Sequence, residues 1–351
     1  MVARPSLAKL TSRSSSRPDI KGEVLDRHNN LLLLTIFKSG YKVVRVWAFG
    51  NTNNPATETN IYYQTLNSTG RFINYDPRNG LPHLDYVVSR AEKLGIKLVM
   101  TLLNNYDDLG GINTYTNAFG GSHNTFYTDA RSQDAYKAYI KFIVQRYKNS
   151  CAIFSWELCN EPRCPQCSTD IIYNWASSIS AYIKSLDPGH MVTLGDEGWL
   201  PNNVPGADGS YAYSGYEGVD FVRNLQIKTL DYGTFHSYPE QWGYSFDWNN
   251  KWIQQHNDVG KKIGKPVVFE EYGATSPELR ARWLPEWQDT VVKKTSLAVD
   301  MVWQFATQLN DGNSPYDNYA IYYDTNPQSE FQKYGAKQAK AMNAKPPVAN
   351  L

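Results

Sequence analysis

The 351-residue chain has almost no net charge, because 35 Lys and Arg residues face 34 Asp and Glu residues and leave a formal charge of +1. Such a chain has no global field to attract nucleic acid or an anionic membrane surface. Composition therefore predicts an uncharged partner and indicates neither nucleic acid nor a membrane as a partner.

Long hydrophobic runs are also missing. The longest, Leu31–Leu34 followed by Ile36 and Phe37, is far shorter than the ~20 residues of a membrane-spanning helix. No apolar stretch follows the first basic residues, so no secretory signal peptide is visible. Residues 1–18 combine basic residues and serines without an acid, which is typical of a disordered tail or a transit peptide; the tail is favoured.

Cysteines are few, with only four in the chain. Cys164 and Cys167 form a Cys-Pro-Gln-Cys sequence, which suits a redox pair, half a zinc site or a small disulfide loop. Because no further cysteine or histidine pair completes a zinc site, a local disulfide ranks above free thiols, and a metal site ranks last. No cofactor or metal is predicted.

Several catalytic motifs are absent as well: GxGxxG, a phosphate-binding loop, GxSxG and HExxH. Their absence argues against nucleotide enzymes, serine hydrolases and zinc hydrolases. Aromatic residues are abundant instead, with 25 Tyr, 10 Trp and 13 Phe. Most are expected in a core, but flat aromatic faces also stack on uncharged ligands such as sugar rings.

Short β-branched runs alternate with helical periodicity, which indicates βα units and a parallel sheet. No linker divides residues 40–340, so a single α/β domain, a (β/α)8 TIM barrel, is favoured over a doubly wound sheet. Legible helices are Leu84–Leu94, ending at Gly95, and Ser132–Tyr147. Seven strands are predicted: Val43–Trp47, Lys97–Leu103, Ala152–Glu157, Met191–Leu194, Tyr232–His236, Pro266–Glu271 and Asp300–Phe305.

The first of the eight barrel strands has no convincing candidate. Leu31–Phe37 looks like a helix that ends at Gly40, so the strand should precede it. Upstream, however, residues Asp19–Asn30 are charged and poor in β formers. The first strand is therefore predicted to be degenerate, displaced or missing. The predicted division is a disordered or altered segment at residues 1–30 and a barrel at residues 31–345.

Polar side chains cluster at the carboxyl ends of the predicted strands, where barrel enzymes place their reactive groups. Two carboxylates facing one cleft are what cleavage of a glycosidic bond requires, and Glu161 and Glu271 are the predicted pair. Pro162 favours an extended conformation for Glu161. Glu270 and Glu271 alternate along one strand, so only one of them is expected to face the barrel axis.

The motifs Trp156–Cys164 and Phe269–Gly273 resemble those of the fungal β-1,4-mannanases of glycoside hydrolase family 5. The segments Lys42–Trp47, Leu194–Gly198 and Gly233–Pro239 resemble that family too, in the expected order. The resemblance covers roughly residues 39–308. It implies a (β/α)8 fold and endo-hydrolysis of β-1,4-mannan.

The resemblance also assigns roles to matched positions. It implies that Glu161 is the acid/base and Glu271 the nucleophile, with Glu270 pointing away. Arg45 and Tyr238 would hydrogen-bond the nucleophile carboxylate. The remaining substrate-binding positions are Asn160 at the 2-hydroxyl, His236 and Trp47 in the cleft, Trp303 under the sugar, and Arg163 and Glu197 on the leaving-group side.

The charges expected around the pair follow from these roles. A guanidinium near Glu271 should favour its ionised form, while Glu161, facing a negative carboxylate, should keep its proton. Carboxyl groups ~5 Å apart would imply retention of anomeric configuration. Departures from the family are Tyr106, where many relatives have Trp, and the Val302–Ala306 sequence.

The implied partner is a β-mannan polysaccharide, the implied state a monomer and the implied location extracellular. Two alternatives stay open. One is a β-1,4-glucanase with the same carboxylates, and the other is an impaired sugar-binding relative with an incomplete barrel.

Overall fold

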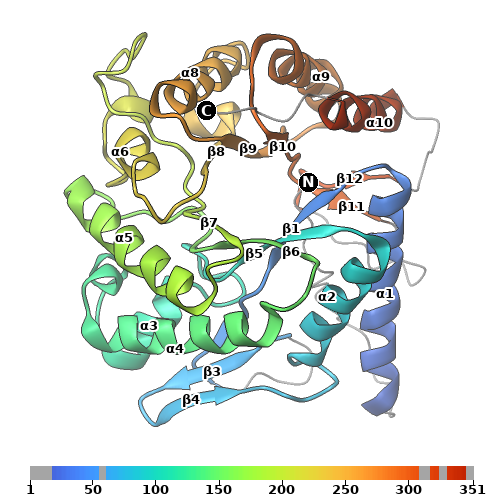
Figure 1. The fold of residues 1–351 in the computed structure, drawn as a ribbon, viewed down its shortest axis with the longest axis vertical. Helices are drawn as coiled ribbons and strands as arrows, with labels where there is room; N and C mark the ends of the chain where they lie inside the picture. The colour runs from blue at the N-terminus through green and yellow to red at the C-terminus, as the bar shows by residue number, and fades with distance from the viewer. Residues whose placement is uncertain (1–17, 55–60, 308–316, 324–329, 345–351) are drawn as a thin grey trace.

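The computed structural model describes residues 18–54, 61–307, 317–323 and 330–344. Parallel strands form a ring that is surrounded by helices (Figure 1). The ring strands are β1 (Val43–Trp47), β5 (Lys97–Thr101), β6 (Ile153–Glu157), β7 (Met191–Thr193), β8 (Gly233–Ser237), β9 (Val267–Tyr272) and β10 (Val299–Asp300). The helices are α1 (Pro18–Lys38), α2 (Pro82–Leu94), α3 (Ile112–Phe119), α4 (Ala130–Tyr147), α5 (Thr169–Leu186), α6 (Phe221–Leu225), α7 (Pro239–Trp242), α8 (Trp248–Ile263), α9 (Pro277–Lys294) and α10 (Glu330–Asn343). Two 3-10 turns, η1 (His123–Tyr127) and η2 (Tyr211–Tyr213), lie in the connecting loops.

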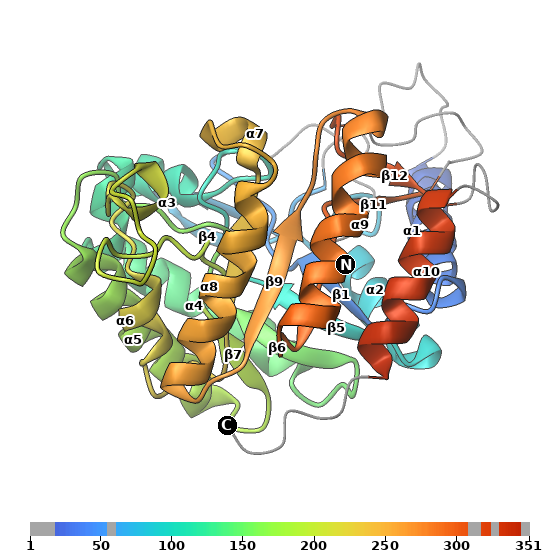
Figure 2. The same ribbon diagram turned by 90° about the horizontal axis from the view of Figure 1, so that it is seen from above.

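The ring consists of two parallel arcs, β1-β5-β6-β7 and β8-β9-β10. Backbone hydrogen bonds join the arcs where the amide of Asp231 donates to Val192 and the amide of His236 donates to Glu197. Helices α8, α9 and α10 pack side by side outside the second arc (Figure 2). This alternation of parallel strands and outer helices is the predicted barrel architecture.

The start of the barrel is helical where a first strand was expected. Residues 19–30 belong to α1, so within residues 18–42 no strand precedes β1. Residues 1–17 lie outside the described part. A cavity of about 100 Å³ lies between the beginning of β1 and β10, lined by Val43, Tyr272, Val299 and residues of α10. The cavity lies where a strand between β10 and β1 would complete the ring.

The division at residue 30 falls inside α1, so it is not an element boundary. The half of α1 after that point packs inward, with Leu32, Leu33 and Ile36 buried. The separation of residues 1–30 from a barrel at 31–345 stays a prediction.

The last ring strand is shorter than predicted. Within the predicted run Asp300–Phe305, the regular ladder with β9 stops at Asp300, although the amides of Met301 and Trp303 still donate to Phe269 and Tyr272 of β9. A separate short strand, β11 (Phe305–Ala306), pairs with β12 (Ile321–Tyr322). A small sheet of β2 (Asn51–Thr52), β3 (Gln64–Asn67) and β4 (Gly70–Ile73) was also missed. Its strands are short and largely polar, so they lack the apolar pattern of the ring strands.

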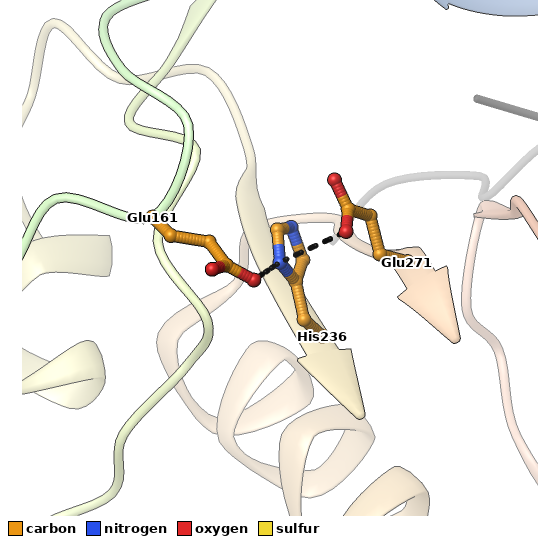
Figure 3. Close-up of side chains that lie close together, drawn as sticks. All are labelled: Glu161, His236 and Glu271. Atoms are coloured by element: carbon orange, nitrogen blue, oxygen red, sulfur yellow. Dashed lines mark hydrogen bonds and ion pairs between the residues drawn. The ribbon is translucent and has the colours of Figure 1, made fainter. Parts of the chain in front are cut away.

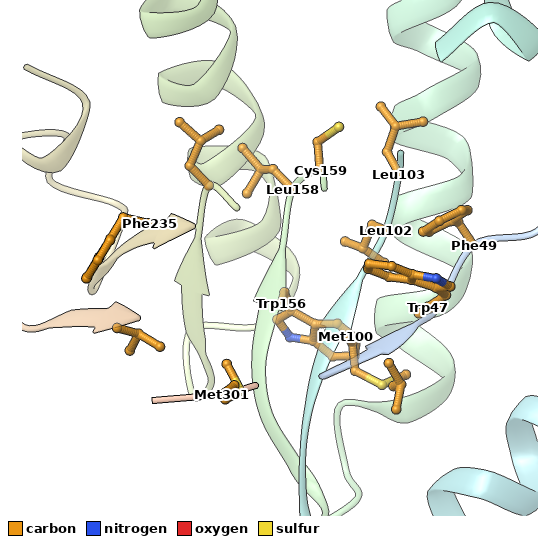
Figure 4. Close-up of a cluster of buried hydrophobic side chains, with 14 of the residues drawn as sticks. Trp47, Phe49, Met100, Leu102, Leu103, Trp156, Leu158, Cys159, Phe235 and Met301 are labelled. Carbon is orange, nitrogen blue, oxygen red and sulfur yellow. The ribbon is translucent and has the colours of Figure 1, made fainter. Parts of the chain in front are cut away.

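The core explains why the ring strands read as continuous apolar runs. In β5 every residue after Lys97 is buried, as expected for a parallel strand covered on both faces. Side chains from neighbouring strands meet there, among them Trp47, Met100 and Trp156 (Figure 4). The indole of Trp156 donates to Asp187 at 2.8 Å, so its polar atom is satisfied.

Two further predictions concern linkage and membranes. Cys164 and Cys167 form a disulfide, which is the alternative that the sequence analysis ranked first.

Among the helices of the described residues, none combines the length and the apolar composition of a membrane-spanning segment.

Candidate active site

The candidate site lies at the carboxyl ends of the ring strands, because parallel strands bring these ends together. Glu161 follows β6, His236 lies on β8, and Glu271 lies on β9. All three are at most 6% exposed, and their side chains point toward one another (Figure 3).

His236 lies between the two carboxylates. Its Nδ1 is 2.7 Å from Oε1 of Glu161 and 3.7 Å from Oε2 of Glu271. The facing atoms of all three residues lie within 4.8 Å of one another. The facing oxygens of the two carboxylates therefore lie within the ~5 Å at which retention of configuration is expected.

Glu161 reaches the site through an unusual backbone conformation. The extended conformation expected from Pro162 is wrong, because Glu161 has φ of +50°, in the left-handed region that non-glycine residues rarely adopt. Its amide donates to the carbonyl of Gly195 at 2.8 Å. Tertiary contacts thus hold a conformation that local sequence disfavours, as is common at functional sites.

Glu271 is held by two donors that the sequence predicted. Nη1 of Arg45 contacts Oε1 of Glu271, and the hydroxyl of Tyr238 donates to Oε2 at 2.6 Å. Arg45 is fully buried and also donates to Glu157 and, at 2.9 Å, to Oδ1 of Asn160. The side-chain amide nitrogen of Asn160, Nδ2, donates to Oδ1 of Asn104 at 3.0 Å.

Glu270 does not point away from this network, contrary to the expectation from strand alternation. The β8–β9 register shifts so that Phe235 pairs with Phe269 and His236 with Glu271, which leaves Glu270 as the extra residue of a β-bulge. Its Oε2 lies 3.5 Å from Nε of Arg45 and 3.4 Å from Nε2 of His236. The bulge therefore lets both neighbouring glutamates enter the interior.

The protonation pattern also differs from the expected one. Burial raises the pKa of Glu161, but the hydrogen bond and charge of His236 outweigh it and bring this pKa to about 2. Burial lowers the pKa of His236, but Glu271, Glu161 and Glu270 raise it well above 6.5. Burial raises the pKa of Glu271 despite the nearby His236 and Arg45. These pKa directions favour a protonated His236 and an ionised Glu161, the reverse of the expectation for Glu161. For Glu271 the effect of burial outweighs that of Arg45, so the expected lowering of its pKa is not found.

A second charged cluster lies beside Glu161. Arg163 donates to Oε2 of Glu197 at 2.7 Å and pairs with Glu217 at 3.3 Å. Burial raises the pKa of Glu197 to about 7 although Arg163 opposes this. The ring of Tyr106, 41% exposed, lies 5.9 Å from the guanidinium of Arg163. Arg163 and Glu197 thus belong to one group next to the carboxylate pair, on the side that Tyr106 borders.

Two tryptophans form an aromatic wall. Trp47 and Trp303 have ring centroids 5.8 Å apart, and the guanidinium of Arg45 lies 4.8 Å from the Trp47 ring. The Trp303 indole donates to Oδ2 of Asp317 at 3.0 Å, and the Trp303–Gln304 peptide is cis. Both indoles are nearly buried, so little of either ring is open to a ligand.

The structure adds three residues that sequence reasoning missed: Glu157, Glu270 as an inward group, and Asp317. Glu157 had a usable signal, since it is a carboxylate at the end of a buried strand. Asp317 had none, because it lies in a loop far from any motif. Among the described residues, Glu161, His236 and Glu271 are also near enough to offer ligands to a metal.

Two buried carboxylates this close, at the carboxyl face of a (β/α)8 barrel and beside an aromatic wall, define the site of a glycoside hydrolase. A sequence model described as GH family 5 beta-mannosidase-like matches residues 21–293. The chain therefore belongs to glycoside hydrolase family 5, and the predicted resemblance is confirmed.

Individual relatives agree with this family. A protein named probable mannan endo-1,4-beta-mannosidase A, from Aspergillus flavus, is 47% identical over 296 residues, which cover 84% of this chain and 75% of the relative. The endo-1,4-beta-mannanase structure from Rhizomucor miehei is 32% identical with a TM-score of 0.82, covering 97% of this chain and 94% of its own. An endo-beta-1,4-mannanase from Thermotoga petrophila gives 32% identity and a TM-score of 0.84, covering 99% and 77%. The structural similarity confirms the predicted fold.

The charge state of His236 is directly testable. Because its pKa is raised, the imidazolium of His236 is expected to persist at pH 7. The contribution of this charge to the free energy of unfolding is fully present below pH ~6.5, and it is lost as the pH rises through the pKa of His236 in the folded protein. We expect side-chain ¹⁵N NMR to show a doubly protonated ring at pH 7.5, assigned by its loss in His236→Asn. A neutral His236 ring at that pH would contradict this arrangement.

Proposed function

We propose that the protein hydrolyses internal β-1,4-mannosidic linkages in mannan, galactomannan or glucomannan with retention of configuration. The observation that carries the proposal is the distance within 4.8 Å between the facing atoms of Glu161 and Glu271. A gap of ~5 Å leaves no room for a water molecule between carboxylate and sugar, whereas inverting enzymes need ~6.5–9.5 Å. The names of the relatives supply the sugar and the linkage.

The first step follows from the contacts of the two carboxylates. Glu271, held by Arg45 and Tyr238, attacks the anomeric carbon and forms a covalent ester. The glycosidic bond breaks, and the leaving oxygen takes a proton from Glu161. That proton comes from Nδ1 of His236, at 2.7 Å from Glu161. As Glu271 becomes a neutral ester, His236 loses a negative neighbour and yields its proton more readily.

The second step reverses the proton transfer. Glu161, now a carboxylate, takes a proton from water, which attacks the anomeric carbon and releases Glu271. Glu161 then returns this proton to Nδ1 of His236, which restores the starting state. Two displacements at one carbon restore the original configuration. Both steps use only side chains and water, so the proposed reaction needs no cofactor.

The surrounding residues fit substrate-binding roles on either side of the cleavage point. Asn160, fixed by Arg45 and Asn104, is proposed to bind the 2-hydroxyl. Trp303 and Trp47 would contact the sugar face, as aromatic rings do with C–H surfaces. Arg163 and Glu197 would bind the leaving-group side, where Tyr106 takes the position of a tryptophan in many relatives.

We also propose that the enzyme acts outside the cell, as a monomer. A β-mannan polymer cannot cross a membrane, and the Cys164–Cys167 disulfide suits an oxidising compartment. The sequence Asn67-Ser68-Thr69 lies at the turn between β3 and β4, where Asn67 is half-buried and Ser68 and Thr69 are exposed, and we propose it as a glycosylation site.

Substrate and cutting pattern are tested together. We expect reducing-sugar release from mannan to exceed that from cellulose or xylan by at least ~100-fold, since a site built around one hydroxyl arrangement rejects its epimer strongly. Mannan viscosity should fall early because internal cuts shorten chains quickly. Mannose alone released at constant viscosity would exclude endo cleavage, and a preference for cellulose would favour the glucanase alternative.

Stereochemistry tests the carboxylate spacing. Proton NMR of a mannohexaose digest should show the β-anomer of the new reducing end first, with the α-anomer growing later by mutarotation. An inverting enzyme would give the opposite order. A folded preparation that yields no product would favour the impaired sugar-binding alternative.

The two carboxylates should be separable by substitution. Glu271→Gln removes the attacking charge and should lower kcat at least ~10³-fold on every substrate, while Glu161→Gln should lose ~10²–10⁴-fold on mannan. Glu161→Gln should recover its first step on a dinitrophenyl β-mannoside, whose leaving group needs no proton. Glu278→Gln, at an exposed site on α9, is the matched control and should be unaffected. Equal losses for both variants on the activated substrate would refute the assigned roles.

A further inference from the structure

The buried glutamate at the β9 bulge connects the two halves of the site. Oε2 of Glu270 lies 3.5 Å from Nε of Arg45 and 3.4 Å from Nε2 of His236. Arg45 holds Glu271, and His236 holds Glu161. One carboxylate oxygen thus touches both cations that bind the proposed catalytic pair.

The charge balance shows which carboxyl beneath the site is ionised. Glu157 and Glu270 are both fully buried against Arg45. Burial raises the pKa of Glu157 to about 8 although Arg45 opposes this, and the nearby charge of Glu270 adds to the effect of burial. Burial also disfavours ionisation of Glu270, but Arg45 and His236 outweigh it, so the pKa of Glu270 is lowered. These directions favour the proton on Glu157 and the charge on Glu270, whereas the two donors that Arg45 directs at Glu157 act in the opposite sense.

We propose that Glu270 is a positioning residue whose carboxylate, held between Arg45 and His236, fixes the proton of His236 at Nε2 and thereby keeps Nδ1 available to exchange a proton with Glu161. The inference rests on the proposed hydrolysis for its kinetic consequences. Its structural content, the proton on Nε2, stands apart from the reaction.

The physical reason lies in the two nitrogens of the ring. A carboxylate at Nε2 accepts a hydrogen bond, so Nε2 carries a proton in both charge states of His236. The proton that moves is then the one on Nδ1, which faces Glu161. If Glu270 were neutral, the Nδ1–H tautomer would become accessible, and in that tautomer Glu161 could no longer return its proton to the ring.

Other charged groups around His236 set the background for any pH effect. Glu161 and Glu271 face its Nδ1 side. From the segment after β7, Asp196 and Glu197 also interact with its charge. Among the charged groups facing His236, Glu270 faces Nε2, so its removal should act on that nitrogen.

The test compares two isosteric changes at neighbouring buried carboxyls. Glu270→Gln keeps the shape and removes the charge, so we expect kcat/KM on mannohexaose to fall roughly 10- to 100-fold, mostly in kcat, as for loss of a hydrogen bond to a charged group. The alkaline limb of its pH profile should shift to lower pH. Glu157→Gln replaces a protonated carboxyl by a neutral amide, so its loss should be several-fold smaller.

The readout independent of catalysis is the ¹⁵N spectrum of His236. In Glu270→Gln the pH at which the imidazolium loses its proton should fall, and the neutral ring should show a mixture of tautomers, with the thermal unfolding temperature preserved. An unchanged His236 titration, or a Glu157→Gln defect as large as that of Glu270→Gln, would overturn the proposal. If the wild-type protein hydrolyses nothing, the proposed function fails, while the His236 titration still decides this inference.

Discussion

The site depends on one buried cation, the guanidinium of Arg45. It lies inside the ring on β1, fully shielded from water, and its donors reach Glu157, Glu271 and Asn160. A charge in such a place is tolerated only when it is paired and hydrogen-bonded. Loss of one partner in a buried ion pair typically costs ~3–5 kcal/mol, so the arrangement of the strand ends is linked to the stability of the barrel.

The barrel supplies the geometry that makes this pairing possible. Arg45 and Glu271 are separated by 226 positions along the chain, yet parallel strands place them at the same end of the ring. The planar guanidinium offers several donors in fixed directions, which a lysine could not do. The guanidinium orients both Glu271, the proposed nucleophile, and Asn160, the residue next to Glu161, so the positions of the two catalytic glutamates are linked through Arg45.

Two local irregularities of the backbone orient the carboxylates of the site. The bulge at Glu270 brings two consecutive glutamates inward, and the left-handed backbone of Glu161 turns its carboxylate toward His236. Neither conformation is favoured locally. Each is stabilised by contacts with distant strands, so the cost of these conformations is offset by the folded barrel as a whole.

The sequence by itself determined much of the scaffold and the identity of the principal residues. Apolar runs bounded by turns predicted the ring strands within a few residues, and Gly95 marked the end of α2 as expected. Positions at strand ends selected Glu161 and Glu271, and the family resemblance added Arg45 and Tyr238 as hydrogen-bond donors to Glu271. These features are local, because periodicity, capping and short motifs are written in adjacent residues.

Tertiary structure alone decided the rest. Strand alternation could not reveal the bulge, since a register shift depends on how β8 meets β9. The expected proton on Glu161 was wrong because the charge of a buried group depends on all its neighbours, and His236 lies 75 positions away. The division of Asp300–Phe305 into two pairings likewise follows from which strand each half meets. These features depend on interactions between residues far apart in the chain, and local sequence patterns do not reveal which distant residues come into contact.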